Sequence, residues 1–300
     1  MRALLLFAFA ALAWSEQLRF APRLSKGQTF DVLITRVLET GQTQMPYDAP
    51  SGRVAVTVLE AGPEGYVLGW APDAAPLDPT ILGNETAALA AAGLAALHFE
   101  PVLDREGRLL RLRNESEVLA QFEKFVRAMT EAKGAQFDDP EMRRKMNDSL
   151  APAVTPEALL ALSAMDLDIF FFAGGKSFDS ERNTRATLEV PNPLGSGGNV
   201  RAERTWTLLP APDGAVSRTV AWSQRIDPQA LRQLMRQMIP VTGVPEESIG
   251  KLPSLEIEDE GELTLNPVTG IPVAVRHTRS QKMGTQMLML LTTEMRVVTK

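Results

Sequence analysis

The segment Leu255–Lys300 reads LEIEDEGELTLNPVTGIPVAVRHTRSQKMGTQMLMLLTTEMRVVTK. Apolar and polar side chains alternate through much of it, which is the period of a half-buried strand. We predict three strands here, at Leu255–Leu265, Ile271–Arg279 and Gln286–Thr299. The residues NPVTG at Asn266–Gly270 predict a tight turn, because Asn-Pro opens a turn and glycine accepts a positive φ. The end of the chain is therefore expected to be a three-stranded antiparallel meander.

Most of the remaining chain repeats this alternation. Further strands are predicted at Gly27–Thr40, Val54–Val58, Tyr66–Ala71, Leu97–Leu103, Arg108–Arg113, Leu167–Ala173, Thr184–Val190, Val200–Leu209 and Val216–Ile226. Gly41–Gly52, rich in Gly, Pro and Gln, is predicted as a loop, and the alanine-rich Glu85–Leu94 as a short helix or an irregular crossing. The predicted fold class is mainly β (α+β), with a single large curved antiparallel sheet or half-barrel of about a dozen strands.

Between residues 114 and 166 the apolar period changes to that of helices. Asn114–Glu117 resembles a capping box. Asp139-Pro140-Glu141 and Thr155-Pro156-Glu157 each place a cap, a proline and an acid where a helix begins. We predict two or three helices that cover the sheet, and one more amphipathic helix after Asp227. No change in composition marks a linker, so residues 16–300 are expected to form a single β-rich domain with a helical insertion at 114–166.

Composition excludes several functions. The formal net charge is -6 and no basic block is present, which argues against nucleic-acid binding. The chain has no cysteine, which excludes disulfides, thiolate zinc sites and cysteine nucleophiles. Its two histidines, His98 and His277, are too few for a histidine metal site, and neither has a serine and carboxylate pattern nearby. We therefore predict no catalytic residue, no metal, no cofactor and no enzymatic activity.

Two motifs look like binding sites, but each has a simpler interpretation. Gly174-Gly175-Lys176-Ser177 ends like a phosphate-binding loop, but Phe170 occupies a position at which that motif requires glycine. The acidic stretch Glu256–Glu262 lacks the spacing of a calcium loop, although a calcium site there stays an alternative. His277, between Arg276 and Thr278, is expected at the polar end of a strand.

The first residues have the pattern of a secretory signal peptide. Met1-Arg2 precedes the apolar run Ala3–Trp14, which ends in small residues. The run is too short to span a membrane, which takes about 20 apolar residues. We predict a signal peptide at residues 1–15, with cleavage after Ala13 or Ser15, and no transmembrane anchor in the mature chain. The expected location is the periplasm or the exterior.

The hairpin Val200–Ile226 has a predictable inner face. Residues 211–214 (APDG) predict a type I turn closed by a left-handed glycine, which would pair Ala211 with Ala215. Even-numbered residues then share one face, which is large and apolar and includes Trp206, Leu208, Val220, Trp222 and Ile226. The other face carries small, mostly hydroxylated residues: Thr205, Thr207, Ser217, Thr219, Ala221 and Ser223.

Methionines are the most suggestive residues for ligand binding. They gather on the helix after Asp227 and on the last strand, and methionine suits surfaces that accept varied apolar partners. Ordinary core packing is the alternative. The predicted ligand-binding residues are Trp206, Leu208, Val220, Trp222, Met235, Met238, Met287 and Met289.

Three segments resemble a family of exported bacterial proteins known as a domain of unknown function. They are Lys26-Gly27-Gln28-Thr29-Phe30, the hairpin Asp104–Leu109 and the late segment Gly261–Pro272. More remotely, a curved antiparallel sheet with a helical lid is similar to the periplasmic lipoprotein-carrier fold, which holds acyl chains in its concave face. The resemblance implies an exported, β-rich bacterial protein.

Together these features predict a non-enzymatic periplasmic protein that binds or carries an apolar ligand, such as a lipid or acyl chain, between its sheet and its helices. The alternative is an envelope structural or interaction module with a filled core and no small-molecule ligand. The sequence does not identify which protein, if any, is a partner.

Overall fold

The computed structural model describes residues 17–41, 43–73, 97–134, 160, 165–179, 183–193, 199–212, 214–242 and 253–299. An antiparallel sheet of 11 strands runs in the order β6-β5-β4-β3-β2-β13-β12-β11-β10-β9-β8. Its strands are β2 (Thr29–Thr40), β3 (Thr43–Gly62), β4 (Gly65–Pro72), β5 (Pro101–Leu103), β6 (Leu109–Leu112), β8 (Thr184–Pro191), β9 (Asn199–Leu208), β10 (Arg218–Ile226), β11 (Leu255–Leu265), β12 (Pro272–Met283) and β13 (Gln286–Thr299). A second sheet pairs β1 (Gln17–Arg19) with β7 (Ser177–Asp179). The prediction of a mainly β fold built on one large antiparallel sheet is confirmed.

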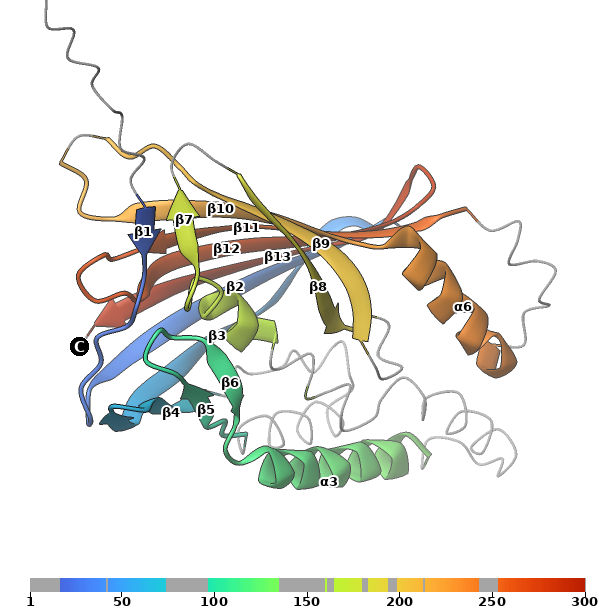
Figure 1. Cartoon of the computed structure of the whole chain (residues 1–300). Coiled ribbons are helices and arrows are strands. Elements are labelled where there is room, and N and C mark those ends of the chain that lie inside the picture. Colours follow the sequence, from blue (N-terminus) through green and yellow to red (C-terminus); the bar gives the residue numbers. More distant parts are fainter. Residues whose placement is uncertain are drawn as a thin grey trace, which may run out of the picture.

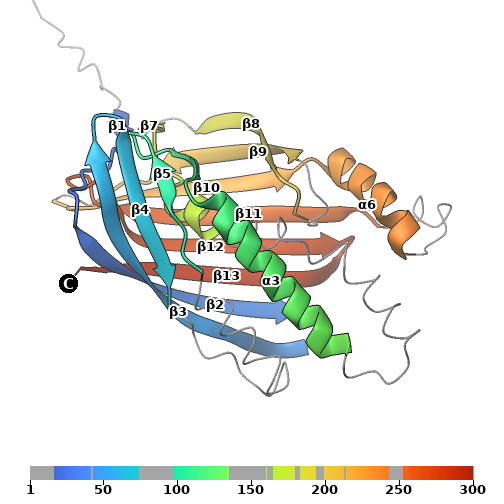
Figure 2. The same ribbon diagram turned by 90° about the horizontal axis from the view of Figure 1, so that it is seen from below.

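The large sheet is curved and open, with β6 and β8 at its edges (Figure 1). Helix α3 (Glu115–Gly134) crosses one face of the sheet, which we call the inner face (Figure 2). Helix α6 (Pro228–Thr242) lies beside β9 and β11. The opposite, outer face carries no helix among the described residues. None of the described helices is both long and apolar enough to cross a membrane.

The predicted C-terminal meander is confirmed, and it forms the middle of the sheet. Gly270 has the positive φ of 67° that its turn requires, and the Asn266 side chain accepts a hydrogen bond from the Val268 N–H at 2.9 Å. The last strand, β13, pairs with β2 along most of its length, from Met289 opposite Thr40 onward. The two ends of the domain are therefore joined side by side within one sheet.

The prediction of a loop at Gly41–Gly52 is wrong. Most of that stretch belongs to β3, where Tyr47 pairs with Leu38 and Ala49 with Arg36. Its Gly, Pro and Gln residues have low strand propensity, but hydrogen bonding to a long partner strand outweighs that preference.

The prediction of a strand at Leu167–Ala173 is also wrong. Residues 165–170 are helical and turns follow to residue 175. Leu167, Ile169 and Phe170 are all buried, whereas Asp168 is exposed and Asp166 pairs with Arg36, so the helix buries its apolar side chains in the core and keeps its two carboxylates out of it. A short unbroken apolar run has no period that distinguishes helix from strand.

Helix α3 begins after Asn114, as predicted, but the Asn114 side chain does not cap it. That side chain accepts a hydrogen bond from the Glu100 N–H at 2.9 Å and donates one to the His98 carbonyl at 2.7 Å. It therefore ties the start of α3 to the segment that leads into β5. The predicted helix starts at Asp139 and Thr155, the segment Glu85–Leu94 and the signal peptide lie outside the described residues.

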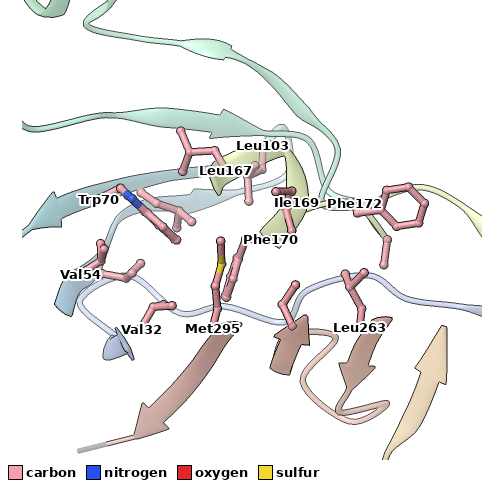
Figure 3. Packing of buried hydrophobic residues seen from close by; sticks show 14 of the residues in the cluster. Val32, Val54, Trp70, Leu103, Leu167, Ile169, Phe170, Phe172, Leu263 and Met295 are labelled. Atoms are coloured by element: carbon pink, nitrogen blue, oxygen red, sulfur yellow. The ribbon is translucent and has the colours of Figure 1, made fainter. Parts of the chain in front are cut away.

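The main apolar core lies between the inner face and residues 165–175 (Figure 3). Phe170 inserts into it and meets the edge of Trp70, with ring centroids 5.4 Å apart. The core contains a cavity of about 20 Å³ beside Phe170, lined in part by Leu68 and Leu265. Such a cavity holds about one water molecule, so the main core is filled as far as the described residues form it.

Candidate functional site

Strand pairing aligns the residues of the inner face into rows that run across the sheet. The polarity of these rows changes from one row to the next along the strands. The first row is apolar and belongs to the main core: Leu208, Val220, Leu263, Val275, Met295 and Ile34. The next row runs Trp206, Trp222, Gly261, His277, Thr293 and Arg36, and the one after it Arg204, Gln224, Asp259, Arg279, Leu291 and Leu38. We call the polar members of these two rows the polar belt: Arg36, Arg204, Gln224, Asp259, His277, Arg279 and Thr293.

Beyond the polar belt the inner face becomes apolar again. On one side α6 closes it: Leu231 packs on Ile226 and Ile257, and all three side chains are fully buried. Toward β2, the apolar residues of β2, β12 and β13 are only half-buried. Leu291 and Leu38 continue the second row of the belt, and Met289 and Met283 lie beyond that row. We call these the methionine strip: Leu38, Met283, Met289 and Leu291.

Asp259 is the centre of the polar belt and is only 1% exposed. Its Oδ1 accepts hydrogen bonds from His277 Nε2 at 2.9 Å and Arg279 Nε at 2.7 Å. Its Oδ2 accepts from Gln224 Nε2 at 3.0 Å and Arg279 Nη2 at 3.1 Å. Burial alone would raise the pKa of Asp259, but the His277 hydrogen bond and the charge of Arg279 lower it to about 2. Asp259 is therefore an ionised, fully bonded anchor inside the sheet.

A stack of three rings covers Asp259 on the side of the main core. Trp222 stacks on Phe172 with centroids 5.0 Å apart, and on His277 with centroids 5.5 Å apart. The indole has room because its cross-strand neighbour is glycine: a Cβ on Gly261 would lie 2.2 Å from Trp222 Nε1. Gly261 therefore leaves the space that the indole occupies when it stacks on the His277 ring.

Two cations lie on the same aromatic surface. The Arg204 guanidinium is 5.2 Å from the Phe172 ring centroid and 5.5 Å from that of Trp222, and its Nε donates to Gln224 Oε1 at 2.9 Å. Lys176 Nζ is 4.3 Å from the Phe172 centroid and donates to the Phe172 carbonyl oxygen. Burial and the charge of Arg204 lower the pKa of Lys176 to about 8. Burial likewise lowers the pKa of Arg204.

Several polar atoms next to these rings are buried and have no hydrogen-bond partner among the residues that the structure describes. They are Trp206 Nε1, Trp222 Nε1, His277 Nδ1 and Thr293 Oγ1. A buried polar group without a partner is costly, and native proteins keep few of them. Their concentration in one row of the inner face marks this row as the candidate site.

The predicted face of the hairpin is confirmed, while its pairing differs by two residues. Trp206 lies directly opposite Trp222, and Leu208 opposite Val220, whereas pairing of Ala211 with Ala215 would have set Trp206 opposite Val220. On the other face, the hydroxyls of Thr205 and Ser223 are 2.8 Å apart, as expected for the polar side.

The predicted ligand-binding residues fall in three places. Leu208, Val220 and Trp222 are buried in the main core, and half-buried Trp206 packs against it. Met287 and Met289 are half-buried on β13, beyond the polar belt. Met235 is half-buried on α6; Met238 belongs to the same helix, but its side chain lies outside the described residues.

The roles of Asp259 and His277 differ from those predicted. The sequence predicts Asp259 in an acidic stretch and His277 at the polar end of a strand, but both side chains are 1% exposed. The alternation of inward-facing and outward-facing residues along each strand indicates that both side chains are buried. Asp259 stands two residues from inward-facing Ile257, and His277 two residues from inward-facing Val275, so both belong to the buried face.

The outer face is hollowed but polar. A groove of about 460 Å³ crosses β9–β12 and is lined by residues that include Thr205, Ser223, Glu262 and Arg276. A neighbouring groove of about 420 Å³ shares Glu262 and Arg276. Hydroxyl and charged side chains do not suit an apolar ligand, so the inner face is the better candidate surface for one.

Comparisons with known proteins identify no family. The chain matches no protein-family model and no curated protein. It is similar to a solved structure of lipovitellin that concerns lipid–protein interactions, with 9% identity and a TM-score of 0.41, over 93% of this chain and 25% of that one. This chain thus spans about a quarter of the lipovitellin chain, and a similarity at this TM-score carries no argument about function. The resemblance to an exported bacterial family stays a prediction.

Proposed function

We propose that this protein binds an amphipathic lipid reversibly, without catalysis, between the inner face of its sheet and its helices. The observation that carries the proposal is the methionine strip beside the polar belt. Its side chains face inward and stay partly exposed, whereas the inward-facing side chains of the neighbouring rows are closed off by residues 165–175 or by α6. An apolar chain and a polar head would each meet a matching surface.

The chemistry of the strip suits an acyl chain. Each buried CH₂ group contributes about 0.8 kcal/mol, so a chain of even modest length binds measurably on such a surface. Methionine is flexible and polarizable and adapts to chains of different shape. The filled main core restricts the lipid to the strip, and it is also the observation that favours the alternative, an envelope interaction module without a small-molecule ligand.

The test compares two leucines of β13 that face opposite sides. Leu291 belongs to the methionine strip, and Leu290 points to the outer face, where it pairs with Glu39 and Ser280. The delipidated full chain would be titrated with a monoacylglycerol, and the protein as purified would be weighed by native mass spectrometry. We expect Leu291→Gln to weaken binding on the order of 10-fold, because an amide would be buried against the chain. Leu290→Gln should bind like the wild type.

Absence of binding by the wild-type chain, with no copurifying lipid, would refute the proposal and favour the interaction module. Equal losses in the two leucine variants would also refute it, because the loss would then reflect general destabilisation of β13.

We further propose that the protein acts outside the cytoplasm, in the periplasm or secreted. The support is the charge, apolar run and small residues of Met1–Ser15. Protein isolated from its native envelope should have a mass that corresponds to a start near Trp14 or Glu16. An uncleaved chain found in the cytoplasm would contradict this.

A further inference from the structure

The aromatic ring of Phe172 carries two cations, and a single carboxylate, that of Asp168, lies near enough to act on both charges. Lys176 Nζ and the Arg204 guanidinium lie 4.3 and 5.2 Å from the centre of the same ring. Within the described residues, Lys176 binds the Phe172 carbonyl oxygen, Arg204 binds Gln224 Oε1, and neither forms an ion pair with a carboxylate. The carboxylate at the centre of the belt, Asp259, is already bonded to His277, Gln224 and Arg279. Two like charges are thus held together in a half-buried place.

Among the described groups around the Phe172 ring, those that can still form hydrogen bonds are mainly donors. A guanidinium has five N–H groups and an ammonium three, and the bonds above use only part of them. Two further donors pack against the same Phe172 ring: Trp222 is stacked on it and Trp206 meets its edge at 6.4 Å, and both indole N–H groups are buried without an acceptor. A tryptophan N–H can only donate. A ligand that satisfies this place must therefore bring acceptors, and a negative charge on it would match the one cation of the two that Asp168 does not offset.

The position of the two cations relative to the strip gives the ligand its orientation. Arg204 stands in the same cross-strand row as Leu291 and Leu38 of the methionine strip, on the same face of the sheet. Lys176 and Arg204 are half-buried, so both remain within reach of solvent. A headgroup at Phe172 and a chain on the methionine strip would lie along one continuous inner surface.

We propose that Arg204 and Lys176 bind the anionic headgroup of the lipid, a phosphate or carboxylate, against the ring of Phe172. This inference rests on the proposed function, because it names the headgroup of the ligand whose chain occupies the methionine strip. Arginine and lysine are the usual partners of phosphate and carboxylate, and the planar fork of arginine binds such groups through two parallel hydrogen bonds. The aromatic stack holds Arg204 in place before the ligand arrives, which reduces the cost of ordering it.

The experiment separates the headgroup from the chain. The delipidated full chain would be titrated with three probes: a monoacylglycerol, the monoacylglycerol phosphate of the same chain length, and glycerol phosphate with no chain. We expect the wild type to bind the phosphorylated lipid at least 10-fold more tightly than the neutral one, and to bind glycerol phosphate far more weakly than either lipid.

Variants then assign the preference to the two cations. Arg204→Gln and Lys176→Gln should each remove most of the preference for the phosphorylated lipid, measured as the ratio of the affinities for the two lipids in the same variant. Lys176→Gln serves as the second variant because Lys176, unlike Arg204, forms no hydrogen bond with the Asp259 network among the described residues, so its loss is less disruptive to folding. The matched control is Arg185→Gln, since Arg185 is an exposed arginine on neighbouring β8 that pairs with Glu203.

The outcomes distinguish failure of the headgroup assignment from failure of the proposed function. Equal affinity for the two lipids, or an unchanged preference in both cation variants, would overturn the headgroup assignment and leave lipid binding intact. Glycerol phosphate bound as tightly as the phosphorylated lipid would also overturn it, because the site would then belong to a free anion. Failure of the wild type to bind either lipid would refute the proposed function itself.

Discussion

Replacing Gly261 with alanine should break the ring stack that organises the polar belt. The new Cβ would lie 2.2 Å from Trp222 Nε1 and 2.4 Å from Cε2, and heavy atoms of real proteins do not come that close. The indole must therefore leave its position between Phe172 and His277. Overpacking of this kind costs about 1–3 kcal/mol, and each lost aromatic contact adds about 0.5–1.5 kcal/mol. Because two such contacts are lost, we expect the free energy of unfolding to fall by about 2–6 kcal/mol.

Urea denaturation followed by tryptophan fluorescence would measure this change. The matched control is Gly52→Ala in β3, where a Cβ would meet nothing within 4 Å. A double-mutant cycle gives the sharper result: in a Trp222→Ala background there is no indole to displace, so Gly261→Ala should cost almost nothing. A Gly261→Ala variant as stable as Gly52→Ala, or one whose cost persists without Trp222, would refute the reasoning.

Three further predictions concern charged groups. The folded-state pKa of Asp259 is about 2 and its unfolded value about 4, so its ionised form stabilises the fold above pH 4. Roughly 2–3 kcal/mol of stability should therefore be lost between pH 4 and pH 2. Acid denaturation of Asp259→Asn should lack this loss. Asp104 Oδ1 accepts the N–H groups of Glu106 and Arg108, each at 2.9 Å, so Asp104→Ala should lower the unfolding free energy by about 1–3 kcal/mol in urea, and an unchanged midpoint would show that the turn forms without it. Lys176 should titrate near pH 8 in ligand-free protein by NMR, and an ordinary value above 10 would contradict the desolvation of its ammonium.

Strand and turn assignments depended on local features and were largely predictable. Strict alternation in β10, β11 and β12 identifies which side chains share a face without knowledge of the neighbouring strands. Glycine at 107, 214 and 270 marks a positive φ that other residues rarely adopt, and all three have it. The mainly β class and the apolar face of the Trp206 hairpin followed from these features alone.

The candidate site was much less predictable, although part of it was visible in the alternation. Asp259 and His277 could have been assigned to the buried face from their spacing to Ile257 and Val275. That the two side chains meet could not, because it depends on which strands are neighbours and on their register. The two-residue difference in the β9–β10 pairing shows how small a change in a loop alters such contacts while leaving the faces unchanged.

Only the tertiary structure decided the conformations of residues 43–52 and 165–170 and the position of the two cations. Residues 43–52 become strand because β2 offers a long partner, and 165–170 become helix because Leu167, Ile169 and Phe170 are then buried together in the main core. Lys176 and Arg204 meet on Phe172 although 28 positions separate them in the sequence. The period of side-chain polarity is a property of each segment, so the sequence of that segment is enough to predict it. Strand pairing and burial depend on several segments together, and their free energies are gained only when the fold is complete.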